Sequence, residues 1–199
     1  MAFSDYKNIS EVQQQFLIVA QEECFLETQA TEPSPQFVAE LCFNQQYFDI
    51  STSEAARTEL IIFPILREVY KPYAKQYELW VQKSLHCDEN LRGTPDYLSA
   101  TRSELGKRVL AKPLLMVVEA KRNDFEEGWG QCLAELVAAQ ILNNDPQLPV
   151  YGIVTDGKRW EFGRLIKNVF SENSGACNTE HLSMLMGSLH YLFKLITGG

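Results

Sequence analysis

Apolar residues recur at helical spacing in the first part of the chain and predict two helices there. The segment 11–29 carries the first set, and Ser10 stands where it can cap that helix. The sequence Glu32-Pro33-Ser34-Pro35 interrupts the pattern, and a second, short helix is expected over residues 36–46. Both segments are rich in acidic residues and glutamine, so we expect residues 1–50 to form an N-terminal helical extension. The apolar residues of the first set are Val12, Phe16, Val19, Ala20 and Cys24.

From residue 51 onward, helical and strand patterns follow one another closely. Ser53 is placed to cap a helix over residues 54–70, which Pro64 interrupts or kinks. The dipeptide Asp156-Gly157 between two apolar runs is a strong signal for a β-hairpin. This order of elements predicts an α/β fold, with a mixed β-sheet flanked by helices, in a core that spans residues 51–199. The predicted strands are 77–87, 96–100, 114–120, 150–155 and 159–165, and the other predicted helices are 126–143 and 179–196.

The acidic residues are concentrated near the start of the chain. The 199 residues carry a net charge of −8 at pH 7, and residues 1–60, with two basic and ten acidic side chains, account for all of it. Within residues 101–122 six basic side chains outnumber two acidic ones, and this run leads into the candidate site described below. An acidic chain is atypical of a strong nucleic-acid binder, although this local basic run weakens that argument against nucleic-acid binding. The same run is also typical of an ordinary solvated loop.

Composition favours a globular, cytoplasmic protein. Hydrophobic residues make up 45% of the chain, enough for an ordinary core, yet the apolar runs are far shorter than the roughly 20 residues that cross a bilayer. The first residues lack the basic region and apolar core of a signal peptide. Five widely spaced cysteines without a Cys-x-x-Cys pair favour reduced thiols over disulfides or a zinc site.

Two acidic residues and a lysine are candidates for chemistry. Asp96 follows Pro95, while Glu119 and Lys121 end the apolar run 114–118, and 22 residues separate the two acids. That interval suits a strand, a connection and a return strand, so we expect both carboxylates side by side at a sheet edge. Two carboxylates this close repel each other unless a cation neutralises them, and Mg²⁺ prefers oxygen ligands of this kind. A lysine beside the metal can hold a water and stabilise charge on a phosphate, which indicates phosphodiester cleavage. A Pro-Asp turn and a strand ending in Glu-x-Lys also occur by chance in α/β proteins.

Four segments, in this order, resemble the PD-(D/E)xK nuclease superfamily, whose fold is called restriction-endonuclease-like. More narrowly, the chain is similar to the nuclease domain at the N-terminus of type I restriction enzyme motor subunits. Two further stretches, 62–66 (Ile-Phe-Pro-Ile-Leu) and 152–162 (Gly-Ile-Val-Thr-Asp-Gly-Lys-Arg-Trp-Glu-Phe), echo that group, and the resemblance covers residues 50–166. The four segments are a helix beginning Ser53-Glu54-Ala55, the turn Pro95-Asp96, the strand end Glu119-Ala120-Lys121 and a following helix with Gln131.

The resemblance implies a role for each of five residues. Asp96 and Glu119 would bind Mg²⁺, or Mn²⁺ in its place, and Glu54 would join the metal shell or orient its water. Lys121 would position the attacking water and stabilise the developing charge. Gln131 would lie near the site and the nucleic-acid backbone.

Each of these roles has a structural alternative. Glu54 directly follows a cap residue, where the helix dipole alone favours an acid. Asp96 suits a turn, Lys121 a solvated strand end, and Gln131 an ordinary helix surface. Glu135 departs from the family pattern, because many members have an aromatic residue four positions after the glutamine. A carboxylate there would repel phosphate and puts DNA contact by that helix in doubt.

The resemblance also implies a nucleic-acid partner, DNA first, and a homodimer, because one site per chain cuts one strand. A non-catalytic binding or regulatory protein that keeps the nuclease fold is the main alternative. A structural subunit that docks a partner through its acidic N-terminal helices is a third reading. The complete set of Asp96, Glu119 and Lys121 favours the enzyme.

Overall fold

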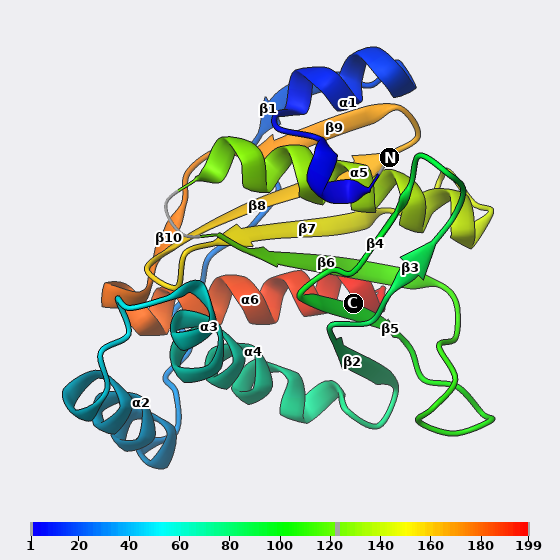
Figure 1. Cartoon of the computed structure of the whole chain (residues 1–199). Coiled ribbons are helices and arrows are strands. Elements are labelled where there is room, and N and C mark those ends of the chain that lie inside the picture. Colours follow the sequence, from blue (N-terminus) through cyan, green and yellow to red (C-terminus); the bar gives the residue numbers. More distant parts are fainter. Residues whose placement is uncertain (1, 122–123, 199) are drawn as a thin grey trace.

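A computed structural model describes residues 2–121 and 124–198 and has a mixed β-sheet with helices on both faces (Figure 1). In these residues the sheet has eight strands, seven of them in the order β1-β9-β8-β7-β6-β5-β2, with β10 paired to β8. The pairs β6–β7 and β1–β9 are parallel, and the other pairs are antiparallel. The α/β class and the mixed sheet are therefore confirmed. The strands are β1 Val19–Glu23, β2 Tyr77–Val81, β5 Tyr97–Thr101, β6 Leu114–Ala120, β7 Val150–Thr155, β8 Arg159–Ile166, β9 Val169–Asn173 and β10 Cys177–Asn178, and β3 Leu85–His86 pairs separately with β4 Arg92–Gly93.

Helices cover the sheet in two layers (Figure 1). One face carries α1 and α5, which join the buried side chains of β5, β6 and β7 in one hydrophobic cluster. The other face carries α2, α4 and α6, which bury their apolar side chains in a second cluster. Because β6 and β7 are covered on both faces, all their residues are buried, as their continuous apolar runs predict. The helices are α1 Ile9–Phe16, α2 Pro35–Tyr47, α3 Glu54–Arg57, α4 Phe63–Tyr70, α5 Phe125–Asn143 and α6 Leu182–Thr197, with short 3₁₀ turns at Phe3–Asp5, Lys71–Tyr73 and Thr179–His181.

The prediction of one long helix over residues 11–29 is wrong. The helix α1 ends at Phe16, and Leu17 adopts a left-handed conformation with φ of 55°. The chain then enters β1, which pairs in parallel with β9. Both strands are polar and lie at the sheet margin, so their pairing is a long-range contact that a local apolar pattern does not encode.

The helix expected over residues 54–70 is helical throughout but has a different interruption. A π-helical turn, Thr58–Ile62, joins α3 to α4, and Pro64 lies in the first turn of α4. Proline has no N–H to donate, so the backbone before it cannot keep the regular hydrogen-bond ladder. The strand expected over 77–87 is also shorter, because β2 ends at Val81 and Gln82 has a left-handed φ of 48°.

Residues 1–50 contribute more than helices to the fold. Phe3, Tyr6, Val12 and Ile18 are buried in the same cluster as α5 and β6, and β1 extends the sheet. The division into an extension and a core at residue 51 remains a prediction.

Gly130 of α5 allows this N-terminal segment to pack closely. A Cβ atom there would lie 2.5 Å from the backbone nitrogen of Asn8 and 2.9 Å from the carbonyl oxygen of Tyr6. Alanine normally stabilises a helix relative to glycine by about 1 kcal/mol. We expect Gly130→Ala to do the opposite and to lower the free energy of unfolding by about 1–3 kcal/mol in urea denaturation. Ile141→Ala, at an exposed position of the same helix, is the control. A stabilised Gly130→Ala protein would contradict the close packing.

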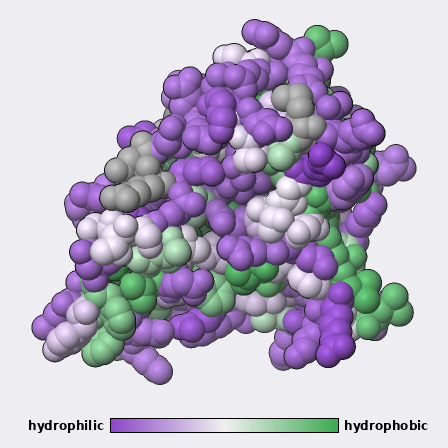
Figure 2. All heavy atoms as spheres, in the orientation of Figure 1, coloured by the Kyte–Doolittle hydropathy of each residue, from purple (hydrophilic) through white to green (hydrophobic). Residues whose placement is uncertain are grey.

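The surface is mostly hydrophilic on the side shown in Figure 2, with hydrophobic side chains gathered near α2. Phe37 and Leu41 bury one side of α2, while Phe43 and Tyr47 on its other side are exposed. Within the described part of the chain, none of the helices has the length and apolar character needed to cross a membrane.

Candidate functional site

The pairing of β5 with β6 brings Asp96 and Glu119 together. The antiparallel register pairs Tyr97 with Val118, and one residue further it places Asp96 opposite Glu119. The backbone N–H of Ala120 donates to Asp96 Oδ2 at 2.8 Å. The expected location at a sheet edge needs correction, because β5 and β6 are interior strands and the acids lie where these strands end.

Lys121, Gln131 and Glu135 form a chain of side-chain contacts beside the two acids. Lys121 Nζ donates to Gln131 Oε1 at 2.9 Å, and Gln131 Nε2 donates to Glu135 Oε1 at 3.3 Å. Because the Gln131 amide nitrogen donates to Glu135, the amide oxygen is turned toward Lys121. Gly128 of α5 permits the approach, since a Cβ there would lie 3.0 Å from Lys121 Cγ. The structure thus brings together Asp96, Glu119, Lys121 and Gln131.

Glu54 lies in the first turn of α3 and is exposed. The Ser53 hydroxyl caps this helix by accepting from the backbone N–H of Ala56 at 3.0 Å. The charge of Glu54 contributes to raising the pKa of Asp96, so the two carboxylates are near enough to interact. The position of Glu54 is therefore compatible with both roles, as a favourable acid at the start of a helix and as a residue of the site.

Glu135 is the site residue whose role the sequence reasoning missed. It was expected to repel a phosphate, but its side chain is fully buried and lies close enough to Glu119 for that charge to raise its pKa. The helix α5 is buried along almost its whole middle, because the sheet covers one side and α1 covers another. Gln131 and Glu135 stand four residues apart and share one helix face, so a polar pair inside an apolar helix was the available signal.

The carboxylates of the site hold protons unusually well. Burial, followed by the charge of Asp96, raises the pKa of Glu119 to about 8. Burial and the charge of Glu119 raise the pKa of Glu135 well above its usual range. Burial also raises the pKa of Asp96, although the hydrogen bond from Ala120 opposes this. The buried Glu119 and Glu135 and the half-buried Asp96 are therefore best stabilised by protons or by a cation.

The donor set fits a hydrated Mg²⁺ ion. Glu119 Oε1 is buried and has no hydrogen-bond partner among residues 2–121 and 124–198, and Asp96 faces it across the strand pair. In the same residues no three His, Cys, Asp or Glu side chains form a metal-binding group. Mg²⁺ commonly takes one or two carboxylates and completes its shell with water and phosphate oxygens, so the pair suffices. Glu54 as a third metal ligand remains a prediction.

Divalent metal should therefore stabilise the protein. At a free Mg²⁺ or Mn²⁺ concentration 100 times its Kd, binding to the folded state contributes about 2.7 kcal/mol and raises Tm by several degrees. Asp96→Asn should remove most of this rise in a thermal melt, because it removes a charged ligand. Asp145→Asn, which changes an exposed carboxylate at the far end of α5, should retain it. An equal rise in both variants would place the metal elsewhere.

The basic run within residues 101–122 does not lead into the site in space. Residues 102–113 connect the end of β5 to the start of β6, whereas Asp96 and Lys121 lie at the opposite end of these strands (Figure 1). Seven residues of β6 separate the two ends, which corresponds to roughly 20 Å. Arg122, the last residue of the run, lies outside the described residues.

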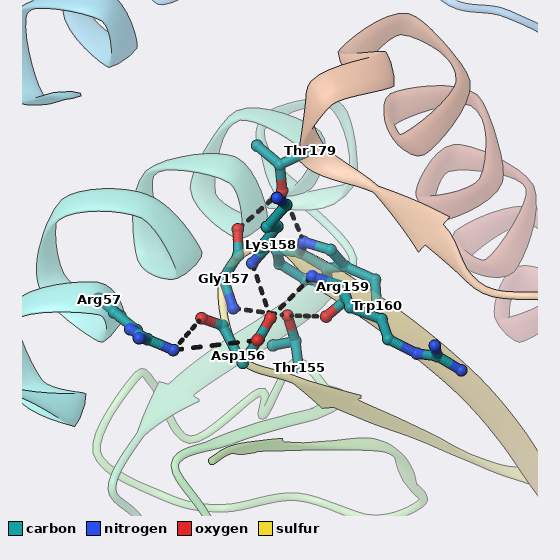
Figure 3. A network of polar contacts seen from close by, with 8 residues as sticks. All are labelled: Arg57, Thr155, Asp156, Gly157, Lys158, Arg159, Trp160 and Thr179. Atoms are coloured by element: carbon teal, nitrogen blue, oxygen red, sulfur yellow. Dashed lines mark hydrogen bonds and ion pairs between the residues drawn. The ribbon is translucent and has the colours of Figure 1, made fainter. Parts of the chain in front are cut away.

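The turn between β7 and β8 lies at the same end of the sheet as the acids and is held by its own side chains (Figure 3). Asp156 Oδ1 accepts the backbone N–H groups of Lys158 at 2.9 Å and Arg159 at 2.7 Å. Thr155 Oγ1 donates to the carbonyl of Arg159 at 2.8 Å and accepts the N–H of Gly157 at 3.0 Å. Gly157 has a φ of 85°, which favours glycine at this position.

Two further contacts tie this turn to the rest of the fold. Thr179 Oγ1 donates to the carbonyl of Gly157 at 2.8 Å and accepts from Trp160 Nε1 at 3.0 Å (Figure 3). The backbone N–H of Lys121 donates to the carbonyl of Thr155 at 2.9 Å. Trp160 is fully buried. The stretch 152–162 thus builds an extensively hydrogen-bonded turn beside the candidate site.

Comparison with known protein families and with curated proteins found no match for this chain. The function is therefore argued from the geometry of the site.

Proposed function

We propose that the protein is a Mg²⁺-dependent phosphodiester hydrolase that acts on nucleic acid and has a restriction-endonuclease-like core. The observation that carries the proposal is the meeting of Asp96, Glu119 and Lys121 at one end of β5 and β6. A buried carboxylate and a half-buried one beside a lysine suit a metal-assisted attack of water on a phosphate.

Each residue of the site has a defined task in this proposal. Asp96 and Glu119 would hold Mg²⁺, which when bound lowers the pKa of a water and neutralises phosphate charge. Lys121 orients the attacking water and stabilises the charge that develops on the phosphate oxygens. Gln131 accepts a hydrogen bond from Lys121 Nζ and fixes its direction, and Glu135 fixes the direction of Gln131.

The topology around the site supports this assignment. An antiparallel pair, β5–β6, is followed by α5 and by the parallel strand β7, so both acids, the lysine and the glutamine come from consecutive elements. The N-terminus of α5 lies at the same end of the sheet, where its dipole favours a phosphate.

DNA is the substrate that we propose first, cut by a homodimer that would place one site on each strand of a duplex. The net charge of −8 opposes general attraction to a duplex, so contacts near the site would have to hold the strand.

Nicking and hydrolysis assays test the proposal. Purified protein is incubated with Mg²⁺ or Mn²⁺ and supercoiled plasmid, single-stranded DNA or RNA, and we expect metal-dependent cleavage of at least one substrate. Metal binding to Asp96 without cleavage of any of them would favour the alternative, a binding or regulatory protein that retains the nuclease fold. The buried and unpartnered Glu119 Oε1 is the observation common to both readings.

A further inference from the structure

Three aromatic side chains form an exposed cluster at the C-terminal end of α2. Phe37 and Leu41 bury the other side of this helix, whereas Phe43, Tyr47 and Phe48 are 53%, 65% and 49% exposed. The ring centroid of Phe43 lies 4.8 Å from that of Tyr47 and 6.2 Å from that of Phe48, so the three rings form one continuous patch. Contiguous exposed apolar groups of this kind are typical of interaction surfaces.

The charge around this aromatic cluster is acidic. Residues 32–59 carry five acidic side chains and one basic one. Asp49 directly follows Phe48, and its Oδ1 accepts the backbone N–H of Ser51 at 2.9 Å and the Ser51 hydroxyl at 2.6 Å. These hydrogen bonds lower the pKa of Asp49, so its carboxylate is charged at neutral pH. Its other oxygen, Oδ2, has no partner among residues 2–121 and 124–198 and is available to a cation of another molecule.

The loop between β5 and β6 has the opposite charge and is also apolar at its surface. Residues 102–113 carry four basic side chains and one acidic one, and Leu105 and Val109 are 83% and 39% exposed. Two successive turns, closed by backbone hydrogen bonds of 3.2 and 3.1 Å, shape this loop. Arg108 lies between the two apolar residues in sequence, is exposed, and forms no ion pair with the residues that the structure describes.

The two surfaces lie on the same side of the molecule. In Figure 1 the helix α2 is at the lower left and the loop between β5 and β6 is at the lower right. A two-fold axis between two copies can therefore bring each loop against the partner's α2, so that the same contact forms twice. Asp49 adjoins the aromatic Phe48, just as Arg108 adjoins the apolar Val109, so one contact can bury the apolar groups and pair the charges.

The distribution of charge favours this pairing over other arrangements of two copies. The net charge of −8 on each chain opposes association in general, and residues 1–60 account for all of it. The loop 102–113, with its excess of basic side chains, is therefore attracted to the acidic part of a second copy. Complementary charge of this kind orients two proteins as they meet and disfavours contacts between like charges.

We propose that the loop between β5 and β6 docks on α2 of a second copy of this chain, in a two-fold dimer. Leu105 and Val109 cover the partner's aromatic cluster, and Arg108 pairs with the partner's Asp49. The inference deepens the proposed function, and the purpose of the dimer, one site for each strand of a duplex, rests on that function. The dimer itself needs neither nucleic acid nor metal, so it is measured without them.

Light scattering coupled to size-exclusion chromatography measures the dimer. At low ionic strength we expect the parent protein to have twice the chain mass of 22.7 kDa, and to dissociate on dilution or with added salt. Arg108→Glu should raise the dimer Kd at least about tenfold, because it places two negative charges opposite each other in both contacts. Arg92→Glu makes the same change on β4, away from the lower side in Figure 1, and should leave Kd unchanged.

The apolar part of the contact has its own pair of variants. Phe43→Ser removes a ring from the centre of the aromatic cluster and should also weaken the dimer. Ile141→Ser makes a comparable change at a position of α5 that is 50% exposed, and should leave the dimer as in the parent. A thermal melt of each variant verifies that it folds.

A mixture of two variants tests the reciprocal contact directly. Asp49→Arg places two positive charges opposite each other, so this protein alone should be monomeric at a concentration at which the parent dimerises, as Arg108→Glu alone should be. In a mixed dimer of the two proteins, one contact pairs the introduced base with the introduced acid. The other contact keeps Arg108 and Asp49 of the parent. We therefore expect the equimolar mixture to regain the dimer, which two misfolded proteins would not do.

Four results would overturn the interface. They are a parent protein that is monomeric at every concentration, a dimer that neither Arg108→Glu nor Phe43→Ser weakens, a mixture that stays monomeric, and oligomers that grow beyond the dimer. A monomeric parent that binds a synthetic amphipathic peptide of leucine and lysine, and loses that binding in Phe43→Ser, would assign α2 to another protein instead.

Cleavage is measured separately on the unchanged protein. A dimer that depends on Arg108 but cuts no nucleic acid would overturn the hydrolase and keep the interface. Metal-dependent cleavage by a parent that is monomeric would overturn only the interface.

Discussion

Asp96→Asn protein is expected to show no metal-dependent cleavage of a nucleic acid that the parent protein cuts. The substitution keeps the size of the side chain and an oxygen that can accept the Ala120 N–H, but it removes the negative charge that would hold Mg²⁺. Lys121→Gln is expected to lower the cleavage rate at least about a hundredfold, because a positioned charge at the developing phosphate charge is lost. Cleavage is measured as single-turnover rates at saturating metal.

Two matched substitutions control this result. Asp145→Asn and Lys107→Gln make the same charge changes, at the far end of α5 and in the loop between β5 and β6. Both should cleave at the parent rate. If Lys107→Gln reduced cleavage as strongly as Lys121→Gln, the opposite end of the sheet would hold the substrate and the proposed site would be wrong.

The second large effect is a loss of stability with rising pH in metal-free buffer. The pKa of Glu119 is raised to about 8 in the folded protein from an ordinary value of 4.5, and that of Glu135 is raised as well. The folded state therefore binds more protons than the unfolded state between these values. Stability is greatest at low pH within this window and falls as pH rises toward 8, by about 1.4 kcal/mol per pH unit for each proton involved.

Glu135→Gln should flatten this dependence in urea denaturation with EDTA. Glutamine has nearly the same shape and still accepts the Gln131 hydrogen bond, but it does not ionise. The variant is thus expected to be more stable than the parent at pH 8, by an amount on the order of a few kcal/mol. Burial lowers the pKa of His190, which gives an opposite slope, but comparison of variant and parent cancels it.

Glu104→Gln, an exposed site in the loop between β5 and β6, serves as the control and should follow the parent curve. A parent protein whose stability is flat from pH 5 to pH 8 without metal would contradict the raised pKa values. Added Mg²⁺ should restore stability most strongly at pH 8, because the metal replaces the protons that the acids lose.

Local signals were sufficient for the centre of the sheet. Residues 114–120 and 150–155 form strands with the predicted bounds, because continuous apolar runs favour strands that are covered on both faces. The Asp156-Gly157 hairpin follows from turn chemistry within a few residues. The helix predicted over 36–46 differs from α2 by one residue at each end, and that over 126–143 differs from α5 by one residue at its start, since each helix is marked by a cap residue or a proline.

Local sequence patterns did not predict the strands at the margin of the sheet, because these strands form by pairing between distant segments. The strands β1 and β9 are separated by more than a hundred residues, and β1 is polar and mostly exposed. Neither strand has a period-two apolar pattern of its own, so only their mutual hydrogen bonds define them. The strand β2 is also shorter than predicted, because Gln82 adopts a left-handed backbone conformation that cannot be predicted from a glutamine at this position.

The sequence by itself determined the α/β class and the two central strands, because these depend on neighbours along the chain, and it singled out Asp96, Glu119 and Lys121 as candidate site residues. Only the tertiary structure decided that Glu135 is buried near Glu119 and that the basic loop lies at the opposite end of the strands from the candidate site. These facts depend on which helix face meets the sheet and on which strand ends coincide. Those are packing relations between distant segments, and they set the burial and the charge environment on which the chemistry of the site rests.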